Sequence, residues 1–281
     1  MPPAASRRGE PELPDRLPIA VVDNHTHLDI SRDGEPIDVA ATLVAARSVG
    51  VDRLVQIGCD LPAARLTVDL VDAHASILGG VALHPNEAPR LAEQGRLEAA
   101  FEEIEALTAH PRIRVVGETG LDYFRTGEDG RGAQEESFRR HIDLAKRTGK
   151  VLQVHDRDAH DEVLRVLDSE GAPEAVVLHC FSGDVRFARA AVERGYYLSF
   201  AGTVTFKSAQ PLRDALAVTP LERILVETDA PYLTPHPWRG ATNAPALMPW
   251  TVRMMAAVLS VSVPELCTVT SATSERIYGP W

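Results

Sequence analysis

The stretch Ile19-Ala20-Val21-Val22-Asp23-Asn24-His25-Thr26-His27 joins an apolar run to a pair of histidines. The β-branched run predicts a buried strand over Ile19–Asp23. Residues two apart on an extended chain point to the same face, so His25 and His27 offer two imidazoles to one metal ion without a bend. The stretch therefore predicts a strand with metal ligands at its carboxyl end.

The same pattern, a short β-branched run followed by a longer amphipathic stretch, recurs about eight times and is typical of βα units. The expected strands are Ile19–Asp23, Arg53–Ile57, Ile77–Leu83, Ile113–Gly117, Val151–Val154, Ala175–Leu178, Tyr196–Phe200 and Arg223–Val226. The expected helices are Val39–Ser48, Pro62–His74, Arg96–Ala109, Gln134–Arg147, Ala159–Ser169, Val185–Arg194, Ser208–Val218, Ala246–Leu259 and Val263–Ile277.

Eight such units in 281 residues favour an α/β fold, a single (β/α)8 TIM-type barrel, over the alternative of a doubly wound open sheet. No Ser/Gly-rich linker divides the chain. Residues 1–18 are rich in Pro, Arg and Glu, and we expect them to form a disordered tail before a barrel domain over residues 19–281. The glycine-rich motifs of dinucleotide and P-loop sites are missing from the sequence, so we expect no dinucleotide cofactor.

The overall composition limits the choice of partners and compartment. Three scattered cysteines and the lack of a long apolar run predict a cytoplasmic protein without a membrane partner. We expect a monomer or a weak oligomer. The net charge of -11 disfavours a protein that coats nucleic acid through a surplus of Lys and Arg. Divalent cations can hold a polyanion locally, so the acidity is compatible with a metal-dependent nuclease.

Metal-competent side chains also follow the later strands. The carboxyl ends of the strands of a parallel barrel converge on one rim, where active sites are built. The side chains expected there are His25, His27, His84, Glu118, His155, His179 and Asp229. One at a time, each has an ordinary structural explanation as a hydrogen-bonded histidine, an ion pair or a turn cap. Together they would leave several buried polar groups unpaired, whereas a metal cluster would satisfy them.

Four imidazoles and two carboxylates exceed what a single tetrahedral zinc needs, so we predict two divalent cations bridged by one carboxylate. Glu118 lies in the middle of the strand order and is the expected bridge. The first cation takes His25, His27 and Asp229 with Glu118, and the second takes His155 and His179 with Glu118. Mixed ligands of this kind accept Zn²⁺, Mn²⁺ or iron, and Mg²⁺ with added waters.

Six motifs of the chain stand in a recognisable order. They are Asp23-Asn24-His25-Thr26-His27, Leu83-His84-Pro85, Gly117-Glu118-Thr119-Gly120-Leu121-Asp122, His155-Asp156-Arg157-Asp158-Ala159, His179-Cys180-Phe181-Ser182-Gly183 and Glu227-Thr228-Asp229-Ala230-Pro231-Tyr232-Leu233. They resemble the motifs of the TatD family of metal-dependent deoxyribonucleases, from about Val21 to Gly279. The resemblance implies a (β/α)8 barrel with two divalent cations on the ligands assigned above. It also implies 3′–5′ exonuclease hydrolysis of phosphodiester bonds in single-stranded DNA.

One loop departs from this family pattern. After Pro237-Trp238-Arg239-Gly240 the family has further basic residues and an Asn-Glu-Pro, whereas this chain has Ala241-Thr242-Asn243-Ala244-Pro245. The change removes two possible phosphate contacts, at Ala241 and Thr242, and one carboxylate. The strength and the polarity of the nuclease therefore stay open.

The expected catalytic residues are Asp229, Glu118 and His84. We expect Asp229 to accept a proton from the attacking water. His84 would bind a phosphoryl oxygen or protonate the leaving group, or would support a ligand from behind. Arg157 and Arg239 are expected to bind substrate phosphates, with an ion pair to Asp158 as the alternative for Arg157.

Other polar and aromatic residues of these motifs have expected supporting roles. Asn24, Asp122 and Ser182 are predicted to orient ligands or water. Phe181 and Tyr123 are candidates for stacking on a base, with a place in the core as the alternative.

Two other functions stay open at this point. A hydrolase of the same barrel acting on an ester, amide or lactone, including an aminoacyl ester on tRNA, would use the same activated water. A barrel that binds metal or a partner without catalysis belongs to another class, and the acidic composition and the less basic loop support it.

Overall fold

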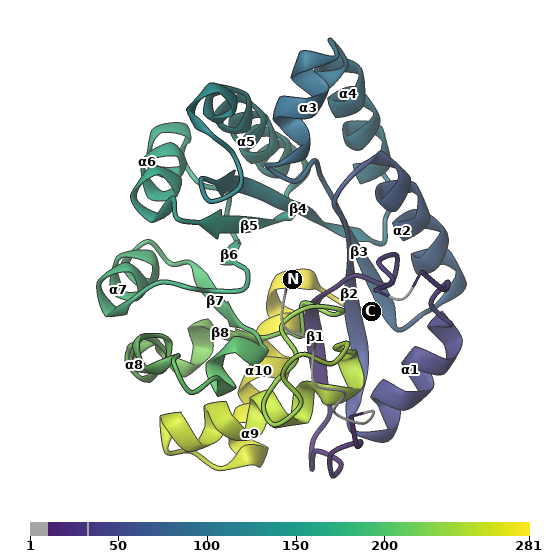
Figure 1. Ribbon diagram of the computed structural model, residues 1–281, viewed down its shortest axis with the longest axis vertical. Coiled ribbons are helices and arrows are strands. Elements are labelled where there is room, and N and C mark those ends of the chain that lie inside the picture. The colour runs from purple at the N-terminus through teal and green to yellow at the C-terminus, as the bar shows by residue number, and fades with distance from the viewer. Residues whose placement is uncertain (1–10, 33) are drawn as a thin grey trace, which may run out of the picture.

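The computed structural model describes residues 11–32 and 34–281. Eight parallel strands form one sheet in the order of the chain, and each strand is hydrogen-bonded to the next. Figure 1 shows these strands around a common centre with helices arranged outside them. The expected (β/α)8 barrel is therefore confirmed over the open sheet.

The elements alternate along most of the chain. The strands are β1 (Val21–Thr26), β2 (Val51–Gly58), β3 (Ile77–Val81), β4 (Ile113–Asp122), β5 (Val151–Arg157), β6 (Val176–Leu178), β7 (Tyr197–Phe200) and β8 (Ile224–Val226). The α-helices are α1 (Val39–Ser48), α2 (Leu61–Ala73), α3 (Glu87–Glu93), α4 (Leu97–Thr108), α5 (Glu128–Thr148), α6 (His160–Glu170), α7 (Val185–Glu193), α8 (Gln210–Val218), α9 (Met248–Leu259) and α10 (Val263–Tyr278).

The barrel closes between β1 and the segment that follows β8. The N–H of Asp229 donates to the carbonyl of His25 at 2.9 Å, and the N–H of His27 donates to the carbonyl of Ala230 at 2.8 Å. The Asp23 carboxylate accepts the N–H of Thr228 at 2.9 Å and the Thr228 hydroxyl at 2.5 Å. This closure places Asp229, at the end of the barrel sequence, beside the two histidines at its beginning.

The interior of the barrel has an apolar floor to which every strand contributes. Its buried side chains from the strands are Val22, Val55, Ile57, Leu78, Val115, Val151, Val177, Tyr197 and Leu225, of which Val55 and Ile57 both come from β2. Side chains alternate between the two faces of a strand, so the next inward positions are Gln153 and His155 on β5, His179 after β6 and Glu227 after β8. The polar cluster therefore lies directly above the floor on the same inner face.

Three strands run at least three residues further at their carboxyl ends than the sequence indicated, and β2 runs one residue further, to Gly58. β1 runs to Thr26, β4 to Asp122 and β5 to Arg157, so His25, Glu118 and His155 lie within strands. The residues of these extensions are mostly polar and lack the apolar alternation of a strand, so the sequence pattern does not reveal them. In the barrel their backbone groups pair with the neighbouring strand, as Gly120 with His155 and Asp122 with Arg157.

Two helical segments also differ from expectation. The short helix α3 was not predicted, and α5 begins at Glu128 rather than Gln134. Gly130 and Gly132 lie in the first turns of α5, and glycine is unfavourable inside a helix. Helix propensity alone therefore predicts a start of α5 at Gln134, which is too late.

The described part of the expected N-terminal tail packs on the barrel. Residues 1–10 lie outside the described residues. Within the expected tail, Leu17 is 2% exposed and its N–H donates to the carbonyl of Val49 at 2.9 Å. Arg16 donates to the carbonyls of Arg47 and Ser48. The expectation of disorder up to residue 18 is wrong for this part, because an apolar side chain anchors it against the end of α1.

The described residues contain no single helix that is both long and apolar enough to cross a membrane. The segments Pro245–Leu259 and Val263–Tyr278 meet such a criterion only as a pair bent by 108°.

Candidate metal centre

Glu118 lies at the centre of a buried group of histidines. Its Oε1 is 3.8 Å from Nε2 of His25 and 3.8 Å from Nε2 of His27. Its Oε2 is 2.7 Å from Nε2 of His179 and 3.0 Å from Nδ1 of His155. Each carboxylate oxygen thus faces a different pair of imidazoles, which is the arrangement expected of a bridging ligand.

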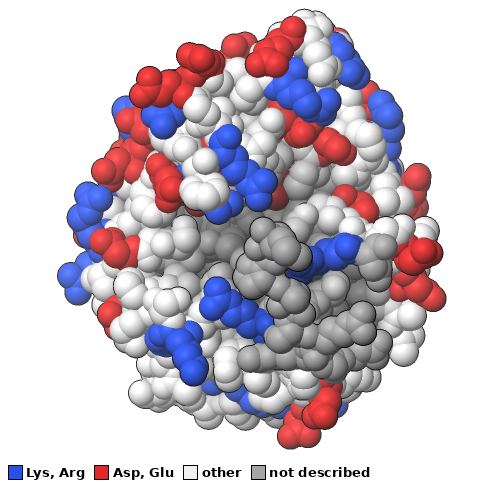
Figure 2. All heavy atoms as spheres, viewed as in Figure 1, with Lys and Arg blue, Asp and Glu red and all other residues white. Residues whose placement is uncertain are grey.

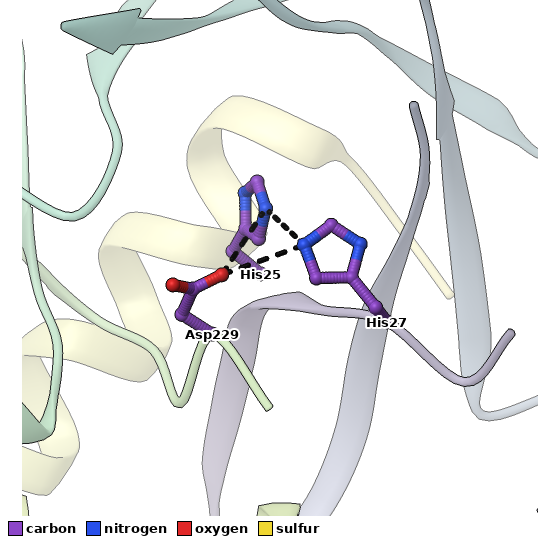
Figure 3. A group of neighbouring side chains, drawn as sticks. All are labelled: His25, His27 and Asp229. Atoms are coloured by element: carbon purple, nitrogen blue, oxygen red, sulfur yellow. Dashed lines mark hydrogen bonds and ion pairs between the residues drawn. The ribbon is translucent and has the colours of Figure 1, made fainter. Parts of the chain in front are cut away.

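Asp229 completes the group around the first histidine pair. Its Oδ1 is 3.4 Å from Nε2 of His27 and 3.9 Å from Nε2 of His25, and the two Nε2 atoms are 3.2 Å apart. Figure 3 shows the three side chains pointing toward one another, His25 from β1, His27 from the position just after β1 and Asp229 from the segment after β8. Their ligand atoms all lie within 4.8 Å of one another, close enough to hold one cation.

His84 lies beside the second histidine pair. Its Nε2 is 3.9 Å from Oε2 of Glu118, and its ring centroid is 4.6 Å from that of His155. Burial lowers the pKa of His84 to about 4, so its imidazole is neutral at neutral pH. Its ligand atom forms a metal-competent group with Glu118 and His155, although the sequence analysis left it off the cations.

In three of the histidines, Nδ1, the ring nitrogen that faces away from the cluster, lies beside a hydrogen-bond acceptor. Nδ1 of His25 is 2.8 Å from the side-chain oxygen of Gln153, and Nδ1 of His27 is 3.0 Å from the carbonyl of Ile57. Nδ1 of His179 is 3.3 Å from Oε1 of Glu227. An acceptor at Nδ1 fixes the proton there and leaves the Nε2 lone pair for a metal. All three Nε2 atoms point into the cluster.

Gln153 and Glu227 were not singled out from the sequence. Both are fully buried, and the N–H of Cys180 donates to Oε1 of Glu227 at 2.7 Å. One signal was available, since Gln153 lies two residues before His155 on a strand and therefore shares its face. Glu227 stands two residues before Asp229 in the same motif.

Cys59, at the end of β2, is another residue that the sequence analysis missed. Its thiol donates to Oε1 of Glu118 at 3.2 Å, and its ligand atom groups with those of His27 and Glu118. Burial raises the pKa of this thiol well above its usual range, with the Glu118 charge acting in the same direction. The thiol therefore acts as a hydrogen-bond donor to the central carboxylate.

The pKa values of the cluster indicate that its buried carboxylates are stabilised by positive charge beside them. Burial raises the pKa of Glu118, but the charge of His179 and the hydrogen bonds from His155 and His179 outweigh burial and hold this pKa well below its usual range. Burial lowers the pKa of His27, but hydrogen bonding and charge from Asp229 raise it to about 9. In the part of the chain that the structure describes, no Lys or Arg pairs with Glu118 or Asp229.

The donor set therefore fits divalent cations. Mixed imidazole and carboxylate ligands suit Zn²⁺, Mn²⁺ and iron, whereas Mg²⁺ prefers oxygen ligands. With the proton of each ring on Nδ1, the Nε2 lone pairs of His25 and His27 face each other at 3.2 Å, and a cation between them would satisfy both.

Asp122 supports the cluster from the side of His155. Its Oδ2 is 3.5 Å from Nε2 of His155 and accepts the side-chain amide of Asn86 at 3.1 Å. Its Oδ1 accepts the N–H of Arg125 at 2.8 Å. The structure thus brings Asp122 next to a predicted ligand, as the sequence analysis expected.

Asn24 and Ser182 do not contact the predicted ligands through their side chains within the described residues. The buried Asn24 amide donates to the carbonyl of Val226 at 2.8 Å and accepts the hydroxyl of Ser274 at 3.1 Å. Ser182 is exposed. The buried Asn24 amide is thus satisfied by β8 and α10, and Ser182 lies at the surface, so their roles in orienting ligands or water stay predictions. The Asn24 carbonyl still accepts from Gln153 at 2.8 Å.

Arg157 and Arg239 stack on aromatic rings near the rim. Arg157 lies two residues after His155 on β5, and its guanidinium carbon is 3.8 Å from the centroid of the Phe124 ring. It forms no ion pair with Asp158 in the described structure, so that alternative is wrong. Arg239 is exposed, with its guanidinium 4.4 Å from the Phe206 ring. Figure 2 shows Lys and Arg side chains on opposite sides of the centre of this face.

The two aromatic candidates differ in their surroundings. Phe181 is 2% exposed and packs on Phe187 and Phe200 at centroid distances of 5.4 and 5.7 Å, so it belongs to the core. Tyr123 is half-buried under the guanidinium of Arg131. The aromatic side chain exposed at this edge is Phe124, at 63%. The sequence analysis did not select it.

The barrel and its buried cluster of histidines and carboxylates define a metal-dependent hydrolase of the (β/α)8 class. The chain belongs to the TatD family, since the model of a family described as TatD related DNase matches residues 22–279. This result confirms the family indicated by the six motifs.

Relatives along almost the whole chain agree with this assignment. A Mycobacterium tuberculosis protein described as uncharacterized metal-dependent hydrolase TatD is 44% identical over 263 residues, covering 92% of this chain and 98% of its own. The Escherichia coli hydrolase YcfH, described in the same terms, is 36% identical over 261 residues, covering 92% and 95%. The crystal structure of YJJV, a TatD homolog from E. coli, has a TM-score of 0.84 at 24% identity, covering 92% and 97%, and supports the fold.

Proposed function

We propose that this chain is a metal-dependent deoxyribonuclease that shortens single-stranded DNA from its 3′ end. The observation that carries the proposal is Glu118, whose two oxygens face two separate pairs of imidazoles. Sites with two bridged cations suit the in-line displacement at phosphorus, because charge on the attacking and leaving oxygens can be stabilised together. The description of the matching family as DNases supports DNA as the substrate.

The proposed centre holds two divalent cations. His25, His27 and Asp229 would hold the first, His155 and His179 the second, and Glu118 would bridge them. Bound cations of this kind lower the pKa of water toward neutrality and polarise phosphoryl oxygens. Zn²⁺ and Mn²⁺ suit the imidazole-rich ligands better than Mg²⁺ does.

Asp229 is our candidate for the residue that accepts the proton of the attacking water. Its Oδ1 faces both histidines of the first pair, and a carboxylate in that place lies beside the reacting atoms. The side chain needs no large movement to serve both as ligand and as base.

His84 is our candidate for holding a phosphoryl oxygen. The N–H of Asn86 donates to Nδ1 of His84 at 3.1 Å, so Nδ1 acts as the acceptor and the proton lies on Nε2. That Nε2 lies near Oε2 of Glu118 and offers a neutral donor at the centre of the cluster. This geometry favours binding of the phosphoryl oxygen over protonation of the leaving group.

Arg157 and Arg239 are proposed to bind phosphates of the substrate strand. Both guanidinium groups stack on rings and keep in-plane N–H donors available for bidentate contact with phosphate. Arg157 is the stronger candidate, since it shares the inner face of β5 with His155.

The test uses metal-reconstituted full-length protein with 5′-labelled single-stranded and duplex DNA, a strand blocked at its 3′ end, an aminoacyl-tRNA and simple carboxyl esters. We expect a ladder of strands shortened from the 3′ end, lost on chelation and on 3′ blocking. Turnover of esters with inert DNA would select the ester hydrolase instead. Metal binding with no turnover of any substrate would select the non-catalytic barrel.

We also propose a reducing, cytoplasmic location. Cys59, Cys180 and Cys267 are all free thiols in the structure, as is usual where thiols are kept reduced.

A further inference from the structure

We infer that a cavity beside β1 is a pocket for a single unstacked base of the substrate strand. The cavity has a volume of about 240 Å³, and His27 and Ala230 form the part of its wall nearest to the candidate metal centre. The inference rests on the proposed nuclease function, because the base would belong to the nucleotide whose phosphate is hydrolysed.

The walls of this base pocket are mostly apolar. Aliphatic and proline side chains line it, among them Leu28, Ile30, Ile37, Pro231, Ala244 and Pro245. The charged residues of the wall are Arg32 and Glu35, of opposite sign, so the wall carries no surplus of positive charge. A phosphate would lose its hydration there without a matching set of donors. The pocket therefore suits a neutral group, while phosphates are left to Arg157 and Arg239.

Thr26 belongs to the pocket wall and is fully buried. Because its hydroxyl has no exposed surface, a base in the cavity does not reach it. The apolar side chains of the wall therefore make the contacts with the base.

The side-chain amide of Asn243, which also lies in the wall, is fully hydrogen-bonded within the protein. The side-chain amide of Asn243 donates to the carbonyls of Thr228 and Tyr232, and its oxygen accepts the N–H of Ala244. Asn243 thus fixes the loop that forms the wall and leaves base recognition to apolar contacts. Binding by apolar contact predicts little discrimination among the bases.

The size of the cavity determines what it accepts. Pockets for drug-sized ligands are roughly 300–1,000 Å³, so a cavity of about 240 Å³ takes a fragment such as one base. A base that is paired and stacked in a duplex cannot enter a cavity until it is flipped or frayed. The pocket therefore predicts a preference for single strands and frayed ends.

The test removes the bases from the end of the substrate strand and, separately, fills the pocket with a larger side chain. The substrates are matched single strands with normal bases or with base-free tetrahydrofuran residues at the last two 3′ positions. For the wild-type protein we expect at least ~10-fold slower cleavage of the base-free strand, in line with the loss of one stacked or packed base. Ala244→Phe fills the pocket, and it should cleave the normal strand as slowly as the base-free one.

Control variants separate the pocket from general damage. Ala241→Phe lies on the same loop outside the pocket wall and should keep the wild-type ratio between the two strands. Ile37→Trp fills the cavity from another side and should reproduce Ala244→Phe, which guards against a single misfolded variant. Metal content should be unchanged in all three variants, since none replaces a proposed ligand.

Binding of strands with hydrolysis-resistant methylphosphonate linkages distinguishes failure of the pocket from failure of the proposed function. Equal cleavage of both strands by wild type, or a wild-type ratio in Ala244→Phe and Ile37→Trp, overturns the pocket and leaves the nuclease standing. If wild type cleaves neither strand, the nuclease proposal fails. In that case, base-dependent binding that Ala244→Phe abolishes supports the pocket, and equal binding of both strands overturns it.

Discussion

Each predicted histidine ligand has a partner on the side away from the cluster, and single substitutions can test the ligands and their partners separately. Glu118 reaches both histidine pairs, whereas Gln153 reaches only His25. Loss of Glu118 should therefore affect the binding of every cation. Loss of Gln153 should weaken the binding only of the cation that His25 holds.

The first prediction concerns the bridging role of Glu118. In Glu118→Ala, metal measured by mass spectrometry should fall from the proposed two ions to fewer than one, and DNA hydrolysis should fall by at least ~100-fold. Glu174→Ala, at an exposed glutamate, serves as the control. Two retained ions with full hydrolysis would rule out the bridge.

The second prediction concerns the support of His25 by Gln153. Gln153→Met removes the acceptor that faces Nδ1 of His25, and outer contacts of this kind contribute about 10–100-fold to metal affinity. We expect such a loss in titrations with Zn²⁺ or Mn²⁺. Gln153→Glu keeps an acceptor in the same place and should retain most of the affinity. Equal affinity in the methionine variant would show that His25 needs no such support.

At the scale of elements, the joint between β4 and β5 positions the middle of the site. Gly120 pairs with His155 across these strands and has φ of +138°. A Cβ at Gly120 would lie 2.1 Å from the carbonyl oxygen of His155, which no rotation of a side chain can relieve. The close approach of the two strands therefore depends on glycine.

This contact gives the third prediction. Gly120→Ala should lower the free energy of unfolding by about 2–4 kcal/mol, through the backbone clash and the unfavourable φ. Gly132→Ala, in α5 with open space around the added methyl, should raise it by about 0.5–1 kcal/mol through helix propensity. Urea unfolding measures both. A Gly120→Ala variant as stable as wild type would show that the strands can separate freely.

The strands also show how far elements could be predicted. All eight were found from their β-branched runs, but the extensions through Thr26, Asp122 and Arg157 were not. Their polar residues lack the apolar alternation of a strand, and hydrogen bonds to the neighbouring strand hold them extended. The period of the sequence thus locates a strand, while pairing decides where it ends.

At the scale of the whole molecule, one buried histidine outside the site links stability to pH. His141 lies on α5 and is fully buried. The N–H of Leu83 donates to its Nε2 at 3.2 Å, and its own Nδ1 donates to the carbonyl of Ser137 at 2.7 Å. This pair of contacts requires the neutral imidazole. No role for this histidine was predicted from the sequence, because Leu83 reaches it from the loop after β3, which is distant in the chain.

The fourth prediction follows from this histidine. Burial lowers the pKa of His141 to about 4, below its ordinary 6.5. The unfolded chain therefore takes up the proton first, and stability present above pH 6.5 is lost as the pH falls toward 4, by about 3 kcal/mol in all. Chelated protein unfolded by urea between pH 7 and 4 measures the loss. His141→Gln should flatten part of the slope, and an unchanged slope would assign it to other groups.

The sequence by itself determined the barrel, the family and the candidate ligands, because a two-residue period and a parallel βα order are local properties. They place His25, His155 and His179 on one inner face wherever the strands close. Only the tertiary structure decided which residues hydrogen-bond to these histidines on the side away from the cluster. Gln153 lies 128 residues from His25 in the chain, and Asn24 turns toward β8 rather than the cluster. Such contacts depend on barrel closure and on satisfying every buried polar group, neither of which a local pattern contains.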